Sequence, residues 1–249
     1  MRTLEQFRNM FSYALGAGSA NLPLEQSGEL ELLDHLAAMW SGRSDVVVVD
    51  VGANDGRYAA AARLTFGADA QIDCFEPDPM SFETLTQRFG QDARTRCHRL
   101  ALSTERGTAR LYTNRGGSPL GSLHREVFDL TGDDAPLTHE VDVDTLDRIS
   151  ELQQINRIDL LKVDVEGHEL AVLQGARELF ARDAIAAVQF EFGSRNIASR
   201  SYLRDFVTLL GADYELFRVT PRGVTPFEYE PSAEVFLEET NYAAIKRAG

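Results

Sequence analysis

Four consecutive valines, residues 46–49, constrain more than any other feature how this 249-residue chain can fold. A continuous apolar, β-branched run is typical of a central parallel strand that is buried on both faces of a sheet. The segment that follows at once, residues 50–56, carries Gly52 and Gly56 and precedes a helix-like stretch at 57–66. A strand, a glycine-containing turn and a helix in this order predict the first βαβ unit of an α/β domain.

The chain continues to alternate between strand-like and helix-like segments after this unit. Apolar runs predict strands at 70–75, 95–100, 158–163, 186–192 and 214–219, and the residue spacing predicts helices at 80–89, 168–180 and 202–210. The predicted fold is therefore α/β, with a Rossmann-like, doubly wound and mostly parallel sheet. Residues 235–237 and 242–245 are expected to add a C-terminal antiparallel hairpin.

Two regions depart from the alternation. Residues 1–44 contain two predicted amphipathic helices, at 1–15 and 29–39. They form an N-terminal extension that could cover a substrate, pack on the main domain, or contact a second copy of the chain in a homo-oligomer. The main domain, residues 45–249, carries an insertion at about 107–143 with short strands at 109–112 and 140–143. Because a loop of this length inside a compact domain is usually functional, we expect it to shape a substrate pocket.

Composition excludes several classes of function. The formal net charge of −14 and the pI of about 4.8 disfavour binding to nucleic acid or to an anionic membrane surface. The two cysteines, Cys74 and Cys97, have no zinc-ligand spacing. Neither a signal-peptide pattern nor an apolar run long enough for a membrane span is found, so we expect a cytoplasmic protein.

Residues 50–56 read D-x-G-x-N-x-G, which differs from the G-x-G-x-x-G of dinucleotide-binding loops. The carboxylates of Asp50 and Asp55 are unfavourable beside a pyrophosphate but favourable beside a sulfonium or an ammonium group. The loop therefore favours a sulfonium cofactor over a dinucleotide. A nicotinamide-dependent oxidoreductase is the alternative that this spacing disfavours.

An acidic residue, Glu76, stands at the end of the second predicted strand. Such a residue is placed to accept hydrogen bonds from both hydroxyls of a ribose. The alternative is that Glu76 caps the next helix. Asp78 followed by Pro79 is itself a good cap, however, and this leaves Glu76 for a ligand.

The segments VVVVDVGANDGRYA, CFEPDP and LLKVDVEGHELAVLQGA, followed by QFEF, resemble the FkbM-type methyltransferases of class I Rossmann-like architecture. The resemblance runs from about residue 46 to the C-terminus. It implies S-adenosylmethionine as methyl donor and, most often, transfer of the methyl group to a hydroxyl oxygen of a small molecule or sugar. By matching position it assigns the cofactor contacts to Asp50, Gly52, Asn54, Gly56 and Glu76, with Leu102 and Ser103 near the adenine edge.

A third cluster, Asp164, Glu166 and His168, follows the strand at 158–163 and is predicted to face the same crevice as Asp50. An alcohol needs to lose its proton to attack a methyl group, and His168 is a candidate base because histidine titrates near neutrality. Asp164 would orient His168 or bind the amino group of the donor. The alternative is that Asp164 and Glu166 cap the following helix together with Glu169.

Two further alternatives remain open from the sequence. Asp164 and Glu191 together could hold a divalent cation, which would make the chain a metal-dependent O-methyltransferase, although two acids without a third ligand do not favour it. A non-catalytic protein that binds the cofactor is also consistent with the fold. The other histidines have no ligand spacing; we expect His98, His124 and His139 at the surface or in loops and His35 packed on a helix.

Overall fold

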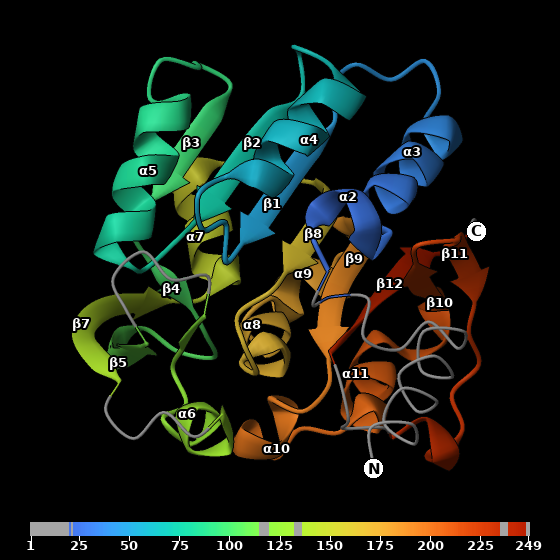
Figure 1. The fold of residues 1–249 in the computed structure, drawn as a ribbon. Coiled ribbons are helices and arrows are strands. Elements are labelled where there is room, and N and C mark those ends of the chain that lie inside the picture. The colour runs from blue at the N-terminus through green and yellow to red at the C-terminus, as the bar shows by residue number, and fades with distance from the viewer. Residues whose placement is uncertain (1–19, 21, 115–119, 132–135, 235–238, 248–249) are drawn as a thin grey trace.

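The computed structural model describes residues 20, 22–114, 120–131, 136–234 and 239–247 (Figure 1). An eight-stranded sheet runs in the order β11-β10-β12-β9-β8-β1-β2-β3. Its parallel part comprises β1 (Val47–Val51), β2 (Gln71–Phe75), β3 (Thr95–His98), β8 (Ile158–Val163) and β9 (Ile185–Phe192). The chain therefore has the predicted Rossmann-like, mostly parallel sheet.

Three antiparallel strands complete the sheet at its C-terminal edge: β10 (Tyr214–Thr220), β11 (Gly223–Pro226) and β12 (Thr240–Lys246). The antiparallel hairpin is formed by β10 and β11, and β12 lies between β9 and β10. The expected strand at 235–237 and the expected helix at 1–15 lie outside the described residues.

Helices cover both faces of the sheet. One face carries α3 (Glu29–Met39), α4 (Arg57–Phe66) and α5 (Pro79–Phe89), and the other carries α7 (Leu146–Gln153), α8 (Glu169–Gln174), α9 (Arg177–Ala181) and α11 (Leu203–Leu210). The valine run explains this layering, because Val48 is buried in the core under α3, α4 and α5, whereas Val49 is buried in the opposite core.

The N-terminal helix α3 belongs to the main body of the fold. Leu32, Leu33 and Leu36 are fully buried in the same core as α4 and α5. A short helix, α2 (Leu24–Ser27), precedes α3 and ends at Gly28, which has a left-handed conformation (φ +94°). Short helical turns also occur at α10 (Asn196–Ser199), η1 (Gly211–Asp213) and η2 (Pro231–Ala233).

The insertion at 107–143 folds as a second, smaller sheet. Its strands, in the order β4-β7-β5-β6, are β4 (Ala101–Leu102), β7 (Leu137–Asp144), β5 (Gly107–Thr113) and β6 (Gly121–Ser122). A short helix, α6 (Glu126–Thr131), follows β6. The expected short strands are thus present but longer than predicted, because β5 and β7 pair along their whole length.

Two differences from the predicted helices have clear physical reasons. Helix α7 was not predicted, although Thr145 caps it and Leu146 and Ile149 are buried beneath it. The helix predicted at 168–180 is divided into α8 and α9 at Gly175. A β-carbon at Gly175 would lie 2.0 Å from the carbonyl oxygen of Ser103, so the backbone of a neighbouring loop passes where a continuous helix would place a side chain. No helix in the described ranges is long and apolar enough to cross a membrane.

Candidate active site

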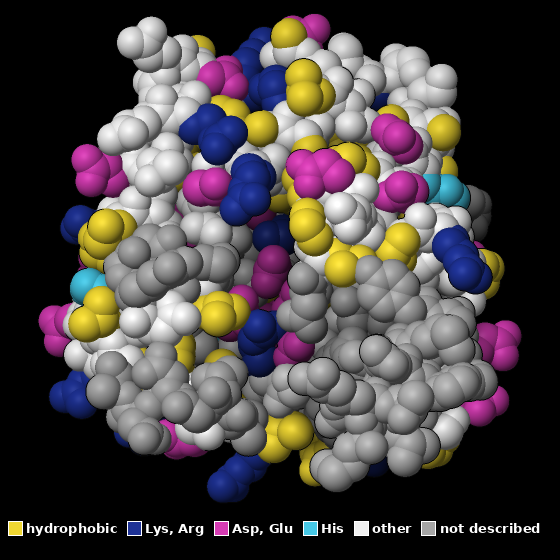
Figure 2. All heavy atoms as spheres, viewed as in Figure 1, with side chains coloured by type: hydrophobic (Ala, Val, Ile, Leu, Met, Phe, Trp, Pro, Cys, Tyr) yellow, Lys and Arg dark blue, Asp and Glu magenta, His cyan; other side chains and the backbone are white. Residues whose placement is uncertain are grey.

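A cleft of about 460 Å³ opens at the carboxyl ends of the central parallel strands. This is where α/β sheets of this topology bind ligands, at the point where the strand order reverses. Figure 2 shows the hollow near the centre of one face of the molecule, with acidic and basic side chains gathered inside it. Residues at the start of the N-terminal helices and in the insertion also contribute to its walls, among them Leu22, Pro23, Leu24, Leu111 and Leu123.

The cleft has two halves, which follow the strands beneath them. The β1–β2 half is lined by Val51, Gly52, Ala53, Asn54, Phe75, Glu76 and Leu102. The β8–β9 half is lined by Glu29, Lys162, Asp164, Glu166, Glu191 and Arg195. The first half thus combines the loop backbone and apolar groups with charged side chains at its edge, namely Asp55, Arg57 and Asp78, whereas the named residues of the second half are all charged.

Glycine is required in the loop of the β1–β2 half. Gly52 has a φ of +79°, and a β-carbon there would lie 1.8 Å from the carbonyl oxygen of Asp164. Gly56 has a φ of +81° immediately before α4, and a β-carbon there would lie 2.6 Å from the ring of Phe89. The loop is thus held against the segment after β8 on one side and against α5 on the other, and its residues Gly52, Ala53 and Asn54 line the cleft.

The carboxylate of Glu76 is fixed beside this loop. Its Oε2 accepts a hydrogen bond from the backbone N–H of Asn54, and its Oε1 accepts one from that of Asp78, both at 2.8 Å. Burial raises the pKa of Glu76 to about 7 despite these two N–H groups. Asp78 caps α5 by accepting from the N–H groups of Met80 and Ser81, so the capping role predicted for Asp78 is observed.

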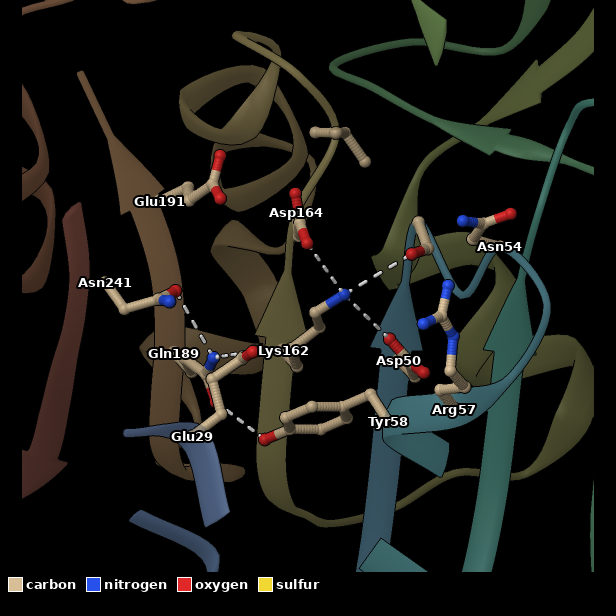
Figure 3. Close-up of polar contacts among 12 residues, drawn as sticks. Glu29, Asp50, Asn54, Arg57, Tyr58, Lys162, Asp164, Gln189, Glu191 and Asn241 are labelled. Atoms are coloured by element: carbon tan, nitrogen blue, oxygen red, sulfur yellow. Dashed lines mark hydrogen bonds and ion pairs between the residues drawn. The ribbon is translucent and has the colours of Figure 1, made fainter. Parts of the chain in front are cut away.

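Lys162, to which the sequence motifs assigned no role, is the centre of the β8–β9 half (Figure 3). Its Nζ lies 3.4 Å from Asp50 Oδ1, 3.2 Å from Asp164 Oδ2 and 3.3 Å from the carbonyl oxygen of Gly52. It also lies over the ring of Tyr58, 5.3 Å from the ring centroid. Although burial opposes it, the neighbouring carboxylates raise the pKa of Lys162 well above its ordinary value, so this lysine is a cation at neutral pH.

This arrangement corrects the role expected of Asp50. Its side chain is fully buried and does not line the cleft, whereas the sequence predicted a direct cofactor contact. The strand that ends at the loop directs this carboxylate toward β8, where it pairs with Lys162. Asp50 therefore contacts Lys162, which lines the cleft, and does not line the cleft itself.

Asp164 accepts no hydrogen bond from the loop before α8, because Glu169 is the acceptor there. The carboxylate of Glu169 accepts hydrogen bonds from the backbone N–H groups of Val165 and Gly167, each at 3.0 Å. Neither Asp164 nor Glu166 caps α8, whose N-cap residue is His168. Glu169 instead holds the loop that precedes α8, and the side chain of Asp164 is 35% exposed.

Glu166 and Glu191 are held by Arg195, a residue that no sequence motif singled out. Arg195 Nε pairs with Glu166, and Arg195 NH1 lies 3.6 Å from Glu191 and 3.4 Å from Glu239. Burial, together with the nearby carboxylates of Asp164 and Glu166, raises the pKa of Glu191 well above its ordinary value. Within the described residues no group of three or more His, Cys, Asp or Glu side chains is arranged to hold a metal ion.

His168 lines the cleft, but both nitrogens of its ring have protein partners. Nε2 lies 2.8 Å from Ser103 Oγ, and Nδ1 lies 3.0 Å from His124 Nε2. Burial and the neighbouring His124 ring lower the pKa of His168 to about 4. His124 lies in a loop of the insertion, as expected, and this loop brings its ring against His168, where it is half-buried.

The remaining histidines take no part in the cleft. His98 is stacked on Phe75, with ring centroids 4.6 Å apart, and contacts Asp73, because β3 places it beside β2. His35 is exposed at the surface of α3 rather than packed, although its ring lies beside Phe217. His139 lies on β7.

A network of uncharged polar side chains holds Glu29 at the back of the β8–β9 half (Figure 3). The Tyr58 hydroxyl donates to Gln189 Oε1 at 2.6 Å, and Gln189 Nε2 donates to Glu29 Oε1 at 2.8 Å and to Asn241 Oδ1 at 3.4 Å. Glu29 also accepts from the Ser27 hydroxyl at 2.9 Å. No sequence motif links these residues, which come from α2, α3, α4, β9 and β12.

Residues 50–216 match the methyltransferase FkbM domain family, which is most of the chain and includes both halves of the cleft except Glu29. The chain belongs to this methyltransferase family. The resemblance seen in the sequence motifs is confirmed, and the fold has the α/β architecture expected of class I S-adenosylmethionine-dependent methyltransferases.

Relatives with assigned activities are similar to parts of this methyltransferase. The 2-O-methyltransferase NoeI of Sinorhizobium fredii is 27% identical over 194 residues, which cover 73% of this chain and 77% of the relative. The methyltransferase sdnD of Sordaria araneosa is 31% identical over 58% of this chain and 66% of its own length. The hexuronic acid methyltransferase AglP of Haloferax volcanii is 28% identical over 53% of this chain and half of its own length.

Solved structures give a more distant likeness. A SAM-dependent methyltransferase from Agrobacterium tumefaciens has a TM-score of 0.48 and 10% identity, over 90% of this chain and 63% of that one. A SAM-dependent O-methyltransferase from Thermotoga maritima has a TM-score of 0.44 and 12% identity, over 87% of this chain and 65% of that one.

Proposed function

We propose that this methyltransferase transfers the methyl group of S-adenosylmethionine to a hydroxyl oxygen of a small molecule or sugar. The observation that carries the proposal is that one cleft joins a glycine loop and the buried carboxylate of Glu76 to an exposed carboxylate, Asp164. A nucleoside cofactor and an acceptor can therefore lie end to end. This arrangement suits a displacement in which the two reactants must be aligned.

The residues of the β1–β2 half fit the cofactor. Gly52 lines the cleft, and only glycine fits there, because a β-carbon would collide with the carbonyl oxygen of Asp164; Gly56 lets the same loop pack against Phe89. Glu76 has unused hydrogen-bond capacity for ribose hydroxyls, because each of its oxygens accepts only one backbone N–H. Leu102 lines the cleft where the adenine would lie, and Ser103 would contribute there through its bond to His168.

When bound, the cofactor supplies a methyl group on a positively charged sulfur. Asp164 is the residue that we propose to align the acceptor hydroxyl and take its proton. Its carboxylate is exposed in the cleft and fixed by Lys162. His168 is disfavoured because protein partners engage both of its ring nitrogens, and Glu166 is disfavoured because it is buried and paired with Arg195.

Calorimetry with S-adenosylmethionine and S-adenosylhomocysteine tests this proposal. We expect dissociation constants of about 1–100 μM, and we expect Glu76→Ala to weaken binding about tenfold or more, as for the loss of a charge-assisted pair of hydrogen bonds. Glu83→Ala removes an exposed carboxylate from the neighbouring helix α5 and should leave affinity unchanged. Equal affinity of the Glu76→Ala variant and the unmodified protein would refute the ribose assignment, and failure of both ligands to bind would refute the function.

A further inference from the structure

The charges in the β8–β9 half are unevenly distributed. Four carboxylates line this half in the described part of the chain, from Glu29, Asp164, Glu166 and Glu191, against two cations, Lys162 and Arg195; the cleft's further cation, Arg57 at the start of α4, pairs with Asp55. Under the proposed function the cofactor binds at Glu76 and the glycine loop of the β1–β2 half. The acceptor is then received by the β8–β9 half. The charge of its wall is therefore a constraint on the chemistry of the acceptor.

Neither cation is available to bind an anion. Lys162 is only 5% exposed, and carboxylates of Asp50 and Asp164 lie within 3.4 Å of its ammonium. The side chain of Arg195 is 15% exposed, and its guanidinium pairs with Glu166, Glu191 and Glu239. Each cation thus has at least two carboxylates around it. Its positive charge is therefore already paired within the protein before any ligand enters.

The carboxylates of this wall are fixed in place as hydrogen-bond acceptors. Glu29 is held by the hydroxyl of Ser27 and the amide of Gln189, and that amide is in turn fixed by Tyr58 and Asn241. Asp164 is held by Lys162. A carboxylate that is fixed at its rear and open toward the cleft accepts hydrogen bonds from hydroxyl groups at little entropic cost.

Additional negative charge is unfavourable in this half. Burial raises the pKa of Glu29, and burial together with Asp164 and Glu166 raises that of Glu191. Both shifts show that a further negative charge in this half costs free energy. A carboxylate or phosphate on the acceptor would lie beside them in a partly desolvated cleft, where repulsion between like charges is strong.

We infer that the acceptor is an uncharged polyhydroxyl compound, such as a neutral sugar unit, and that the β8–β9 half rejects acceptors that carry a carboxylate or a phosphate. The inference rests on the proposed function and adds to it the chemical class of the acceptor. It sets this chain apart from the Haloferax volcanii relative, whose name assigns it a hexuronic acid.

The test uses three probes that differ mainly in charge: methyl α-D-glucopyranoside, D-glucuronamide and D-glucuronate. Binding to the full chain saturated with S-adenosylhomocysteine is followed by saturation-transfer NMR at about pH 7.5, where a uronate is ionised. We expect both neutral probes to bind in the millimolar range and glucuronate to bind about tenfold more weakly than the amide, since the two have nearly the same shape.

Charge-removing variants show whether the wall causes this preference. We expect Glu191→Gln to raise the affinity for glucuronate relative to glucuronamide about threefold or more, because it removes one negative charge and releases part of Arg195. Glu29→Gln removes a charge from the opposite side of the same half and should act in the same direction. Glu151→Gln, on the exposed surface of α7 and outside the cleft, is the matched control and should change nothing.

Equal or tighter binding of glucuronate, or no binding of either neutral probe, would overturn the inference. An unchanged preference in both cleft variants would overturn the role of the wall. Calorimetry on the same samples separates this inference from the proposed function: a protein that binds S-adenosylhomocysteine but accepts glucuronate refutes only the acceptor class. A protein that does not bind S-adenosylhomocysteine refutes both.

Discussion

The two halves of the cleft are built in different ways. In the β1–β2 half, consecutive residues of one loop adopt a backbone path that only glycine permits at Gly52, and one side chain, Glu76, fixes that path. In the β8–β9 half, residues from α3, β8, β9 and the segment after β9 meet as side chains, and ion pairs centred on Lys162 and Arg195 hold them. The first half is local in sequence, and the second is assembled by the fold.

This difference corresponds to the proposed division of tasks between cofactor and acceptor. The local half lies within residues 50–216, which match the family, and would bind the cofactor that the family shares. The assembled half includes Glu29 and is backed by Asn241, and both residues lie outside that range. Because the β8–β9 half is built partly from residues outside 50–216, its acceptor specificity can differ between family members that keep the same cofactor loop.

The largest effect is expected in the local half, from Gly52→Ala. The new β-carbon would lie 1.8 Å from the carbonyl oxygen of Asp164, so the loop or β8 must move. We expect affinity for S-adenosylhomocysteine to fall about 100-fold, which corresponds to about 2.7 kcal/mol.

Gly42→Ala is the matched control, since Gly42 also has a positive φ (+86°) but open space around its β-carbon. This control should lose about 1 kcal/mol of folding stability and no affinity. Equal loss of affinity in both variants would show that the close contact at Gly52 is unimportant.

In the assembled half, Lys162→Met should have the largest effect on folding. It leaves the fully buried Asp50 without its cation, and removing one partner of a buried ion pair costs about 3–5 kcal/mol. Urea denaturation measures the loss. The double variant with Asp50→Asn should recover part of it, because no uncompensated charge then remains. A loss below about 1 kcal/mol in the single variant would contradict the central position of Lys162.

The affinity for S-adenosylhomocysteine should depend on pH through Glu76, and this distinguishes Glu76 from the carboxylates of the β8–β9 half. Its pKa of about 7 is raised by burial, so the free protein gives up this proton as the pH rises through 7. Ribose hydroxyls donate to the ionised form, and binding should therefore strengthen between about pH 6 and 8, with release of a proton. Calorimetry in buffers of different ionisation enthalpy detects that proton. We expect affinity in Glu76→Gln to be lower and independent of pH over this interval, and the same slope in both proteins would assign the proton elsewhere.

The smallest effect is expected in the titration of His168, which contacts Ser103 and the insertion residue His124. Burial and the His124 ring lower its pKa from 6.5 to about 4, so the ring should stay neutral from about pH 8 to 5. A depressed pKa also means that the stability gained by burying the neutral ring is complete above pH 6.5 and is lost as the pH falls toward 4. NMR of the ring protons, assigned with His168→Asn, tests this. Titration near the ordinary histidine pKa would make His168 a candidate base again.

The local half was largely predictable from sequence, and the reasons are physical. The valine run, Gly52, Gly56 and Glu76 act through neighbours in the chain or through the end of one strand, so their spacing carries the information. Even here Asp50 was misplaced, because whether a carboxylate at a strand end faces the cleft or the adjacent strand depends on the partner that β8 supplies.

The assembled half was only partly predictable. Asp164, Glu166 and Glu191 were singled out from their strand ends, but their cations were not, since a lysine inside a buried strand and an arginine after β9 have no motif. The sequence pattern does not indicate that Glu29 lines the cleft, because its position depends on how α3 packs. The contact between His124 and His168 likewise depends on the folding of the insertion.

The central claim is that the cofactor occupies the β1–β2 half and the acceptor the β8–β9 half. A crystal structure with bound S-adenosylhomocysteine measures this directly. We expect the ribose hydroxyls on Glu76, and the sulfur within about 4 Å of the Asp164 side chain, facing the β8–β9 half. A sulfur directed away from Asp164, or an adenosine bound in the β8–β9 half beside Glu191, would contradict the claim.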